Sequence, residues 1–312
     1  MLKKIVTCAV LVISSSIGMS AITPTNTVEN VFVPSGDAKL FCRIIGKGKP
    51  LIVIHGGPGI SQDYLLPGMY NLAENNRVIF YDQRGCGQST SEISEDSISM
   101  ESFVNDIEAI RKFLDVDKIS ILGHSWGGFV AMQYAIAFEN HLDKLILSNS
   151  APATSEGYAL FGQEYMRRML PYQDPLDKMI KTTGFLEADP DVVEQFYRLI
   201  FRQYCYIPEK ADLLNLRMTS EATLNGRKVS EILRKKVLGK PFDLNSDLKA
   251  LKVSALILHG DYDPIPVITA KGVHDHIFKS KFILMKNCGH FPYVEDPVNY
   301  FEHIKEFLNS KI

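Results

Sequence analysis

The chain has 312 residues, of which 46% are hydrophobic and 22% are charged, and its formal net charge at pH 7 is −2. This length accommodates one large α/β domain with an insertion, or two smaller domains, and the composition is that of a globular protein. The small net charge argues against a protein that binds nucleic acid, because such proteins carry a basic excess with clustered lysine and arginine.

The N-terminus has the pattern of a secretory signal peptide. Lys3 and Lys4 precede an apolar run over residues 5–17, and small residues follow up to Ala21. A membrane-spanning helix needs about 20 apolar residues, so this run predicts a leader of residues 1–20 that is removed during export, with no stable membrane insertion. We therefore expect an exported protein, periplasmic or secreted. The alternative is an N-terminal anchor that stays attached.

Short apolar, β-branched runs predict the strands of the first half of the chain. Residues 28–33 and 38–45 flank a Pro-Ser-Gly-Asp turn and predict a hairpin at the edge of a larger sheet. Buried parallel strands are predicted at residues 51–54, 77–81, 119–122 and 145–147. Residues 99–114 have apolar positions at helical spacing and predict a helix with one buried stripe.

The character of the chain changes after residue 150. Strand-like runs disappear, and aromatic-rich segments with helical spacing take their place at residues 160–170, 192–204 and 210–224. Strands resume at residues 255–258 and 282–285, and an amphipathic helix is predicted over residues 298–308.

This order of elements predicts the fold class. Strands that alternate with helices, interrupted once by a helical block, indicate an α/β fold with a mostly parallel sheet flanked by helices. We assign the core to residues 28–150 and 251–312, and a helical cap insertion to residues 151–250.

Ser125 is the candidate nucleophile. It is the centre of Gly123-His124-Ser125-Trp126-Gly127, which fits G-x-S-x-G between a predicted strand and a helix-compatible segment. That context is typical of a nucleophile elbow, a strained turn that exposes the serine hydroxyl. The two glycines are required there because side chains at their positions would collide. The alternative is a glycine-rich turn with an incidental serine.

A serine hydroxyl needs a base to activate it and a carboxylate to orient that base. Asp263 and His290 each follow one of the last two predicted strands. Reactive groups of parallel sheets lie at the carboxyl ends of the strands, so we expect both side chains near Ser125. The chain order Ser, Asp, His is that of α/β-hydrolases. Asp261 is the alternative acid, but the extra residues let Asp263 reach across to the next loop.

The oxyanion of a tetrahedral intermediate needs backbone N–H donors. Trp126 follows the nucleophile and is expected to supply one of them. The second is expected from residues 55–59, where glycines let the backbone approach the substrate, and we assign it to Gly57 with Gly56 as the alternative. A phosphate-binding loop is disfavoured, because neither of the usual glycine-rich phosphate patterns is present.

Three segments resemble the signatures of the proline iminopeptidase branch of α/β-hydrolases. They are HGGPG at residues 55–59, DQRGCGQS at residues 82–89 and GHSWGG at residues 123–128. The resemblance implies the α/β-hydrolase fold and a serine exopeptidase that removes an N-terminal residue, often proline, under a helical cap and without metal or cofactor. It implies the nucleophile Ser125, the base His290, the acid Asp263 and the oxyanion donors Gly57 and Trp126. Asp82 and Arg84 are then expected to fix a loop.

The cap is where the resemblance is weakest. An exopeptidase must recognise a free α-ammonium group, which one or two carboxylates from the cap would bind. The usual glutamate-bearing segments are not recognisable. Glu194 and Glu221 are the candidates for binding the amine, and the alternative is that both are solvated helix residues. The aromatic residues between Phe196 and Tyr206 predict either an apolar substrate pocket or the core of the cap itself.

The sequence thus predicts a serine hydrolase that acts on peptide N-termini. An acyl-enzyme would form on Ser125, and a water activated by His290 would hydrolyse it. The expected partner is a small peptide or ester, not nucleic acid. An esterase or lactone-type hydrolase with the same triad is the alternative within enzymes, and a ligand-binding protein that has lost turnover is the alternative outside them.

Overall fold

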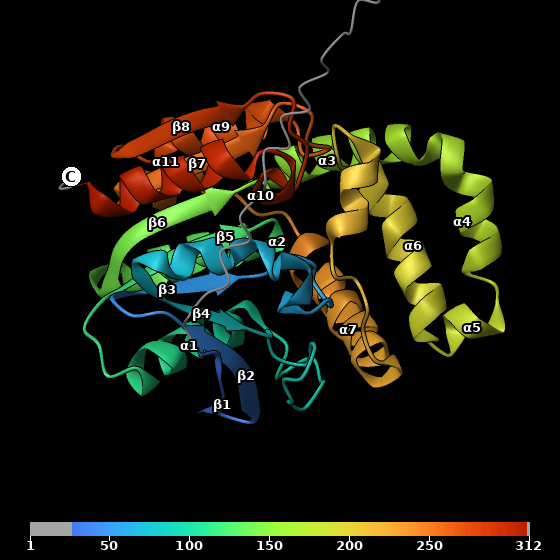
Figure 1. The fold of residues 1–312 in the computed structure, drawn as a ribbon, viewed down its shortest axis with the longest axis horizontal. Coiled ribbons are helices and arrows are strands. Elements are labelled where there is room, and N and C mark those ends of the chain that lie inside the picture. The colour runs from blue at the N-terminus through green and yellow to red at the C-terminus, as the bar shows by residue number, and fades with distance from the viewer. Residues whose placement is uncertain (1–26, 311–312) are drawn as a thin grey trace, which may run out of the picture.

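An eight-stranded sheet organises residues 27–310, the part of the chain that this computed structural model describes (Figure 1). Its strands are β1 (Glu29–Ser35), β2 (Ala38–Ile45), β3 (Lys49–Ile54), β4 (Asn76–Tyr81), β5 (Ile119–His124), β6 (Leu142–Ser148), β7 (Ser254–Gly260) and β8 (Ser280–Met285). The predicted leader of residues 1–20 lies outside the described residues.

Helices cover both faces of this sheet. The α-helices are α1 (Met100–Phe113), α2 (Trp126–Phe138), α3 (Ser155–Met169), α4 (Gln173–Met179), α5 (Thr183–Leu186), α6 (Pro190–Arg202), α7 (Ser220–Leu233), α8 (Asn245–Ala250), α9 (Val267–His276), α10 (Pro292–Glu295) and α11 (Pro297–Asn309). Within residues 27–310, none of them is both long enough and apolar enough to cross a lipid bilayer.

The strand order is β1-β2-β4-β3-β5-β6-β7-β8. From β4 to β8 all neighbours are parallel, whereas β1 and β2 form an antiparallel hairpin that joins the sheet by antiparallel pairing of β2 with β4. The predicted edge hairpin and the mostly parallel α/β sheet are therefore confirmed. Parallel pairing brings the carboxyl ends of β3, β5, β7 and β8 to one edge, where the loops that carry the site begin.

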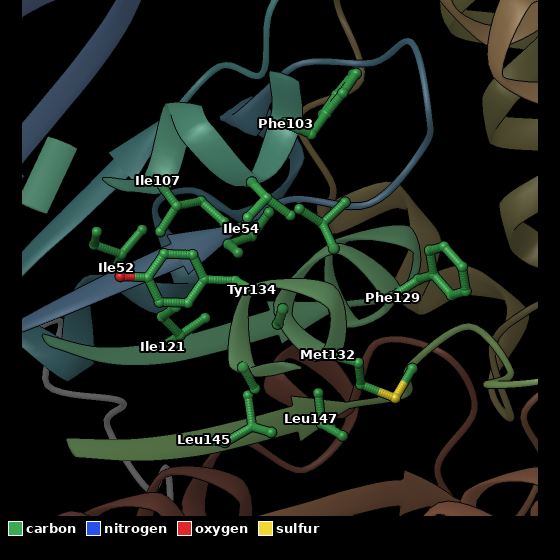
Figure 2. Packing of buried hydrophobic residues seen from close by; sticks show 14 of the residues in the cluster. Ile52, Ile54, Phe103, Ile107, Ile121, Phe129, Met132, Tyr134, Leu145 and Leu147 are labelled. Atoms are coloured by element: carbon green, nitrogen blue, oxygen red, sulfur yellow. The ribbon is translucent and has the colours of Figure 1, made fainter. Parts of the chain in front are cut away.

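Successive residues of β3 contribute to two different cores, one on each face of the sheet. Ile52 and Ile54 pack with the residues of α1 and α2 shown in Figure 2, and Leu51 and Val53 pack with those of α11. The two buried faces explain why the central strands are continuous apolar runs rather than alternating ones. Helix α2 is buried on nearly all sides between the sheet, α1 and α8, so it also lacks a polar face.

Between β6 and β7 the described chain contains only helices and loops. In Figure 1, helices α4, α5, α6 and α7 lie together to the right of the sheet. This is the block of residues 151–250 that the sequence assigns to a cap.

One predicted helix is wrong. Residues 210–224 do not form a single helix, because a 3₁₀ turn at Pro208–Leu213 is followed by an extended segment over residues 214–219. Side chains in this segment are alternately buried and exposed, the period of an extended chain. Helix α7 then begins where the Thr219 side chain accepts a hydrogen bond from the Ala222 N–H at 3.1 Å.

Candidate active site

Ser125 occupies a strained turn between β5 and α2. Its φ of 57° and ψ of −123° lie outside the regions that L-residues normally adopt. A Cβ on Gly123 would lie 2.3 Å from the carbonyl oxygen of Gly127, and a Cβ on Gly127 would lie 2.2 Å from that of Ile54. Larger residues are therefore excluded at both positions, as the G-x-S-x-G pattern predicts. The serine itself lines a cavity.

Asp263 and His290 lie against each other in the loops that follow β7 and β8. The Nδ1 atom of His290 is 2.9 Å from Oδ2 and 3.1 Å from Oδ1 of Asp263, and both side chains are buried. The alternative acid, Asp261, is exposed and faces Lys286 at 3.6 Å. Because His290 lines the same cavity as Ser125, the structure brings the three predicted residues to one site.

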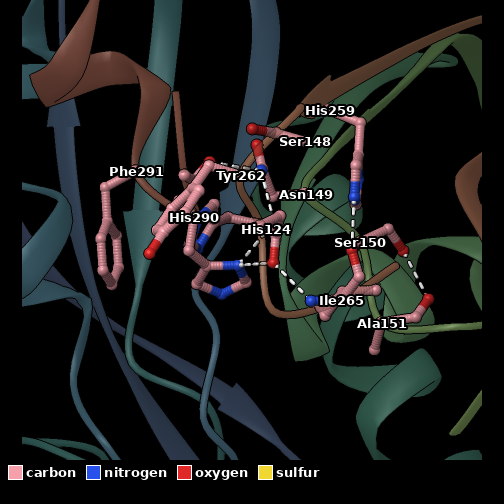
Figure 3. A network of polar contacts seen from close by, with 12 residues as sticks. His124, Ser148, Asn149, Ser150, Ala151, His259, Tyr262, Ile265, His290 and Phe291 are labelled. Carbon is pink, nitrogen blue, oxygen red and sulfur yellow. Dashed lines mark hydrogen bonds and ion pairs between the residues drawn. The ribbon is translucent and has the colours of Figure 1, made fainter. Parts of the chain in front are cut away.

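Several donors hold the carboxylate of Asp263, and Figure 3 labels three of the residues that supply them, Asn149, Ile265 and His290. The Asn149 side chain donates to Oδ2, and the Ile265 N–H donates to Oδ1 at 2.8 Å. Burial alone would raise the pKa of Asp263, but the neighbouring His290, with smaller effects of His259 and the Asn149 hydrogen bond, outweighs it, and the pKa falls to about 2. Asp263 is thus ionised at neutral pH and accepts the Nδ1–H of His290. That tautomer leaves Nε2 free to act as a base.

Gly56 and Gly57 differ in what their N–H groups do. The Gly56 N–H donates to the Tyr64 hydroxyl at 2.6 Å, so it is already occupied. Gly57, with a φ of 126°, lines the cavity. Trp126 is the first residue of α2, where a backbone N–H has no acceptor within its own helix. Of the predicted oxyanion donors, Gly57 is therefore favoured over Gly56, and Trp126 lies directly beside Ser125.

A buried chain of hydrogen bonds connects the glycine loop to the loop of His290. His124 Nε2 lies 2.8 Å from the carbonyl oxygen of His290, which can only accept, so Nε2 carries the proton. Nδ1 then accepts from the Tyr64 hydroxyl at 2.6 Å, and the Tyr64 oxygen accepts the Gly56 N–H. Burial, together with the nearby His290, lowers the pKa of His124 to about 3, so the ring stays neutral and the direction of the chain is fixed.

Gln83 makes a second connection, from the glycine loop to Trp126, the residue that follows Ser125. Its amide donates to the carbonyl oxygen of His55 at 2.7 Å and accepts from the Trp126 indole N–H at 3.1 Å. The flanking residues hold the Gln83 loop. The Asp82 carboxylate accepts the backbone N–H groups of Gln62 and Gln88, each at 2.8 Å. Arg84 donates two hydrogen bonds to the buried carboxylate of Asp106 in α1.

These connecting residues were missed or undervalued by the sequence prediction. His124 looks like a neighbour of the elbow, and neither Tyr64 nor Asn149 belongs to a motif. Asn149 could have been found by the rule that selected Asp263, because it directly follows β6 at the carboxyl edge of the sheet. For Tyr64 no comparable signal exists, since it follows no strand and its partner His124 is distant in the sequence.

The cavity beside Ser125 has a volume of about 350 Å³. Its cap-side wall is mostly aromatic and consists of Tyr158, Phe161, Tyr165, Tyr197, Phe201 and Tyr204, together with Ile200 and Ser230. The predicted aromatic cluster is therefore divided. Part of it lines the cavity, whereas Phe196 packs on Phe185 within the cap and Tyr206 is exposed against Tyr262.

Among the described residues, no aspartate or glutamate lines this cavity. Glu194 pairs with Arg198 at 2.6 Å along α6, and Glu221 is exposed in the first turn of α7. The structure thus does not bring either candidate glutamate to the site, and both are ordinary helix residues. Within residues 27–310, no group of three or more histidine, cysteine or acidic side chains is placed to hold a metal ion.

The cap is hydrogen-bonded to the loops of His290 and Asp263. The His290 N–H donates to the carbonyl oxygen of Tyr204 at 2.7 Å. The Glu295 carboxylate accepts N–H groups from both sides, Tyr206 in the cap at 2.6 Å and Gly289 at 2.8 Å. Arg168 of α3 reaches the carbonyl oxygen just before Asp263 at 2.8 Å. The cap therefore helps to position the histidine and the aspartate.

Comparison with known proteins agrees with this architecture. The family model of the α/β-hydrolase fold matches residues 49–297. The chain therefore belongs to the α/β-hydrolase fold family and is a hydrolase of that fold. A proline iminopeptidase of Clostridium botulinum is 30% identical to it, over 89% of this chain and 97% of the relative. Within the family, the chain lies in the proline iminopeptidase-like branch.

Two solved structures show the same fold at lower identity. The crystal structure of proline iminopeptidase from Mycobacterium smegmatis has a TM-score of 0.66 at 22% identity, covering 90% of this chain and 97% of that one. An esterase from Exiguobacterium antarcticum has a TM-score of 0.65 at 21% identity, covering 90% of this chain and 100% of the other. The fold is therefore common to a peptidase and an esterase, and the fold alone does not indicate whether the substrate is a peptide or an ester.

Proposed function

We propose that the protein is a serine hydrolase that forms an acyl-enzyme on Ser125. The observation that carries the proposal is the pairing of His290 Nδ1 with the ionised Asp263 beside a cavity that Ser125 also lines. Nε2 of His290 takes the serine proton as Oγ attacks the carbonyl carbon, and then gives that proton to the leaving group. A water molecule, activated by the same nitrogen, releases the acyl group.

Backbone donors stabilise the negative charge that develops on the carbonyl oxygen. Gly57 and Trp126 are the proposed donors, and losing one such donor typically costs about 10²–10³ in kcat. The hydrogen bonds of Gln83 tie the backbone at His55 to the Trp126 indole, so the two donors are held relative to each other.

For the substrate we propose an N-terminal aminoacyl bond, with proline as the first choice. Relatives that are 30–31% identical to this chain, over 85–89% of its length, are proline iminopeptidases. The aromatic wall suits the apolar proline ring, and its π faces can hold a cationic amine in place of a carboxylate.

A carboxylic ester with an uncharged acyl group is the second candidate. It is favoured by the absence of an acidic side chain from the described cavity wall, because a buried α-ammonium normally needs a charged partner. The same catalytic residues would cleave such an ester.

Three chromogenic substrates separate these possibilities. They are proline p-nitroanilide, its N-acetyl derivative and p-nitrophenyl butyrate. An aminopeptidase cleaves the free amine much faster than the N-acetyl compound, whereas an esterase prefers the butyrate. Ser125→Ala should lower kcat by at least about 10³-fold on any of them, and Ser246→Ala, an exposed serine on α8, is the matched control. Hydrolysis that survives Ser125→Ala would refute the proposed nucleophile.

We also propose that the protein is exported after removal of residues 1–20. The charged start, the apolar run and the small residues that follow it support this. Intact-mass measurement on the exported protein should give a chain that starts at residue 21 or 22. A mass that includes Met1 would contradict the proposal.

A further inference from the structure

A second cavity adjoins the one beside Ser125. It has a volume of about 280 Å³ and shares Pro58, Tyr197 and Ser230 with the first cavity. Its remaining wall contains two arginines, Arg227 and Arg234. A substrate bound at Ser125 therefore has a cationic compartment next to it, on the far side of Pro58 and Tyr197.

Helix α7 fixes the place of this compartment. In Figure 1, α7 lies between the sheet and α6. Its backbone touches the glycine loop, because a Cβ on Gly226 would lie 1.9 Å from the carbonyl oxygen of Gly59. Arg227 follows directly, Ser230 lies three residues later on the same face, and Arg234 immediately follows the last residue of the helix. The arginines therefore lie along the wall that Ser230 extends to the first cavity.

The two arginines differ from the other arginines of the cap. Arg198 and Arg202 each have a carboxylate partner, at 2.6 and 2.7 Å, and Arg217 pairs with an aspartate of α6. Within residues 27–310, neither Arg227 nor Arg234 is paired with a carboxylate.

One acidic residue, Glu231, shares the second cavity, so its charge must be considered. It lies four residues before Lys235, whose pKa it helps to raise, after the larger effect of Glu95. The compartment therefore holds two positive charges against one negative charge. The guanidinium of Arg227 stacks on Phe185, 4.2 Å from the ring centroid, and this leaves its N–H edges available to an anion.

We propose that Arg227 and Arg234 form a carboxylate-binding pocket for the leaving group of the substrate. The inference rests on the proposed function and specifies its substrate class. The aromatic cavity accepts the apolar acyl group, so the cationic compartment receives the part of the substrate beyond the scissile bond. Arginine binds a carboxylate through two parallel hydrogen bonds. The preferred substrate therefore carries a free carboxylate on its leaving group, as a short peptide with an unblocked C-terminus does, or an ester of a hydroxy acid.

Matched substrate pairs test this pocket. The peptide pair is prolylglycine and prolylglycinamide, and the ester pair is 4-carboxyphenyl butyrate and its methyl ester. The protein should cleave the charged member of the pair it accepts with a kcat/KM about tenfold higher. Arg227→Gln and Arg234→Gln should each remove most of that preference by raising the KM of the charged member. Lys228→Gln, an exposed cation on α7, should keep the preference.

The outcomes distinguish this inference from the proposed function. Active protein with equal kcat/KM for both members of a pair overturns the pocket and leaves the hydrolase proposal intact. A preference that persists in the Arg227→Gln, Arg234→Gln double variant also overturns it. Without turnover of any substrate, the proposed function fails, and binding of 4-hydroxybenzoate measured by calorimetry decides on the pocket. Binding that the double variant loses supports the pocket, and equal binding to both proteins refutes it.

Discussion

Tyr64 offers a sharp test of the hydrogen-bond chain beneath the site. Its buried hydroxyl accepts the Gly56 N–H and donates to His124 Nδ1, each at 2.6 Å. Tyr64→Phe keeps the ring and removes both bonds, leaving two buried polar groups without partners. Each such group costs about 1–3 kcal/mol, so we expect a loss of about 2–6 kcal/mol in the free energy of unfolding.

The same substitution should also reduce activity. Gly56 precedes the proposed oxyanion donor Gly57, and His124 is bonded to the backbone of His290. Complete loss of an oxyanion donor costs about 10²–10³ in kcat, and a displaced donor costs less. We therefore expect kcat to fall about tenfold for Tyr64→Phe, with a smaller change in KM.

Urea unfolding followed by circular dichroism, and steady-state kinetics on the best chromogenic substrate, measure the two effects. Tyr70→Phe is the matched control, because that ring packs edge-on against Phe80 and lies only partly buried. Its unfolding free energy and kcat should stay close to those of the unmodified protein. If Tyr64→Phe changes stability by less than about 0.5 kcal/mol and leaves kcat unchanged, the hydrogen-bond chain does not support the site as described.

Two other predictions concern stability. Gly127→Ala should prevent folding or cost several kcal/mol, because its Cβ would meet a backbone oxygen at 2.2 Å. Gly162→Ala, whose Cβ would meet no atom within 4 Å, should stabilise α3 by about 1 kcal/mol. Equal melting temperatures for the two variants would contradict this prediction. Acid should also destabilise the protein. Burial lowers the pKa of His55 to about 4 and that of His124 to about 3, so the unfolded chain binds more protons below pH 6.5 and stability falls as the pH falls. Asp82 acts oppositely, because burial raises its pKa to about 6. We expect a net loss on the order of 4 kcal/mol from pH 7 to pH 4, and urea midpoints that stay constant over this range would refute it.

The fold could be predicted largely because its strands are buried on both faces. Such strands are uninterrupted apolar runs, which the sequence shows plainly at β3, β4, β5 and β7. The helix predicted at residues 210–224 is wrong because its apolar residues do not form an uninterrupted run. That segment packs by alternation, but its leucines and lysine also suit a helix, and helical neighbours on both sides hid the shorter period.

The candidate site could be predicted only where a local motif or a strand end marked it. Ser125, Asp263 and His290 follow strands, and glycines flank the turns around them. By contrast, Tyr64 and the Arg227 pocket depend on contacts between segments far apart in the chain. Their roles follow from which loops meet above the sheet, and no spacing in the sequence encodes that.

The bonds from the cap to His290 and Asp263 have a practical consequence for redesign. Deleting the whole insertion to admit bulkier molecules would remove the carbonyl of Tyr204 that anchors His290, and Arg168 with it. His290 and the loop of Asp263 would thereby lose the hydrogen bonds that hold them in position. Helices α4 and α5, which bury no residue completely, can be shortened without touching either anchor. Diversification of this scaffold is therefore expected to favour that outer pair and to conserve the segment around Tyr204.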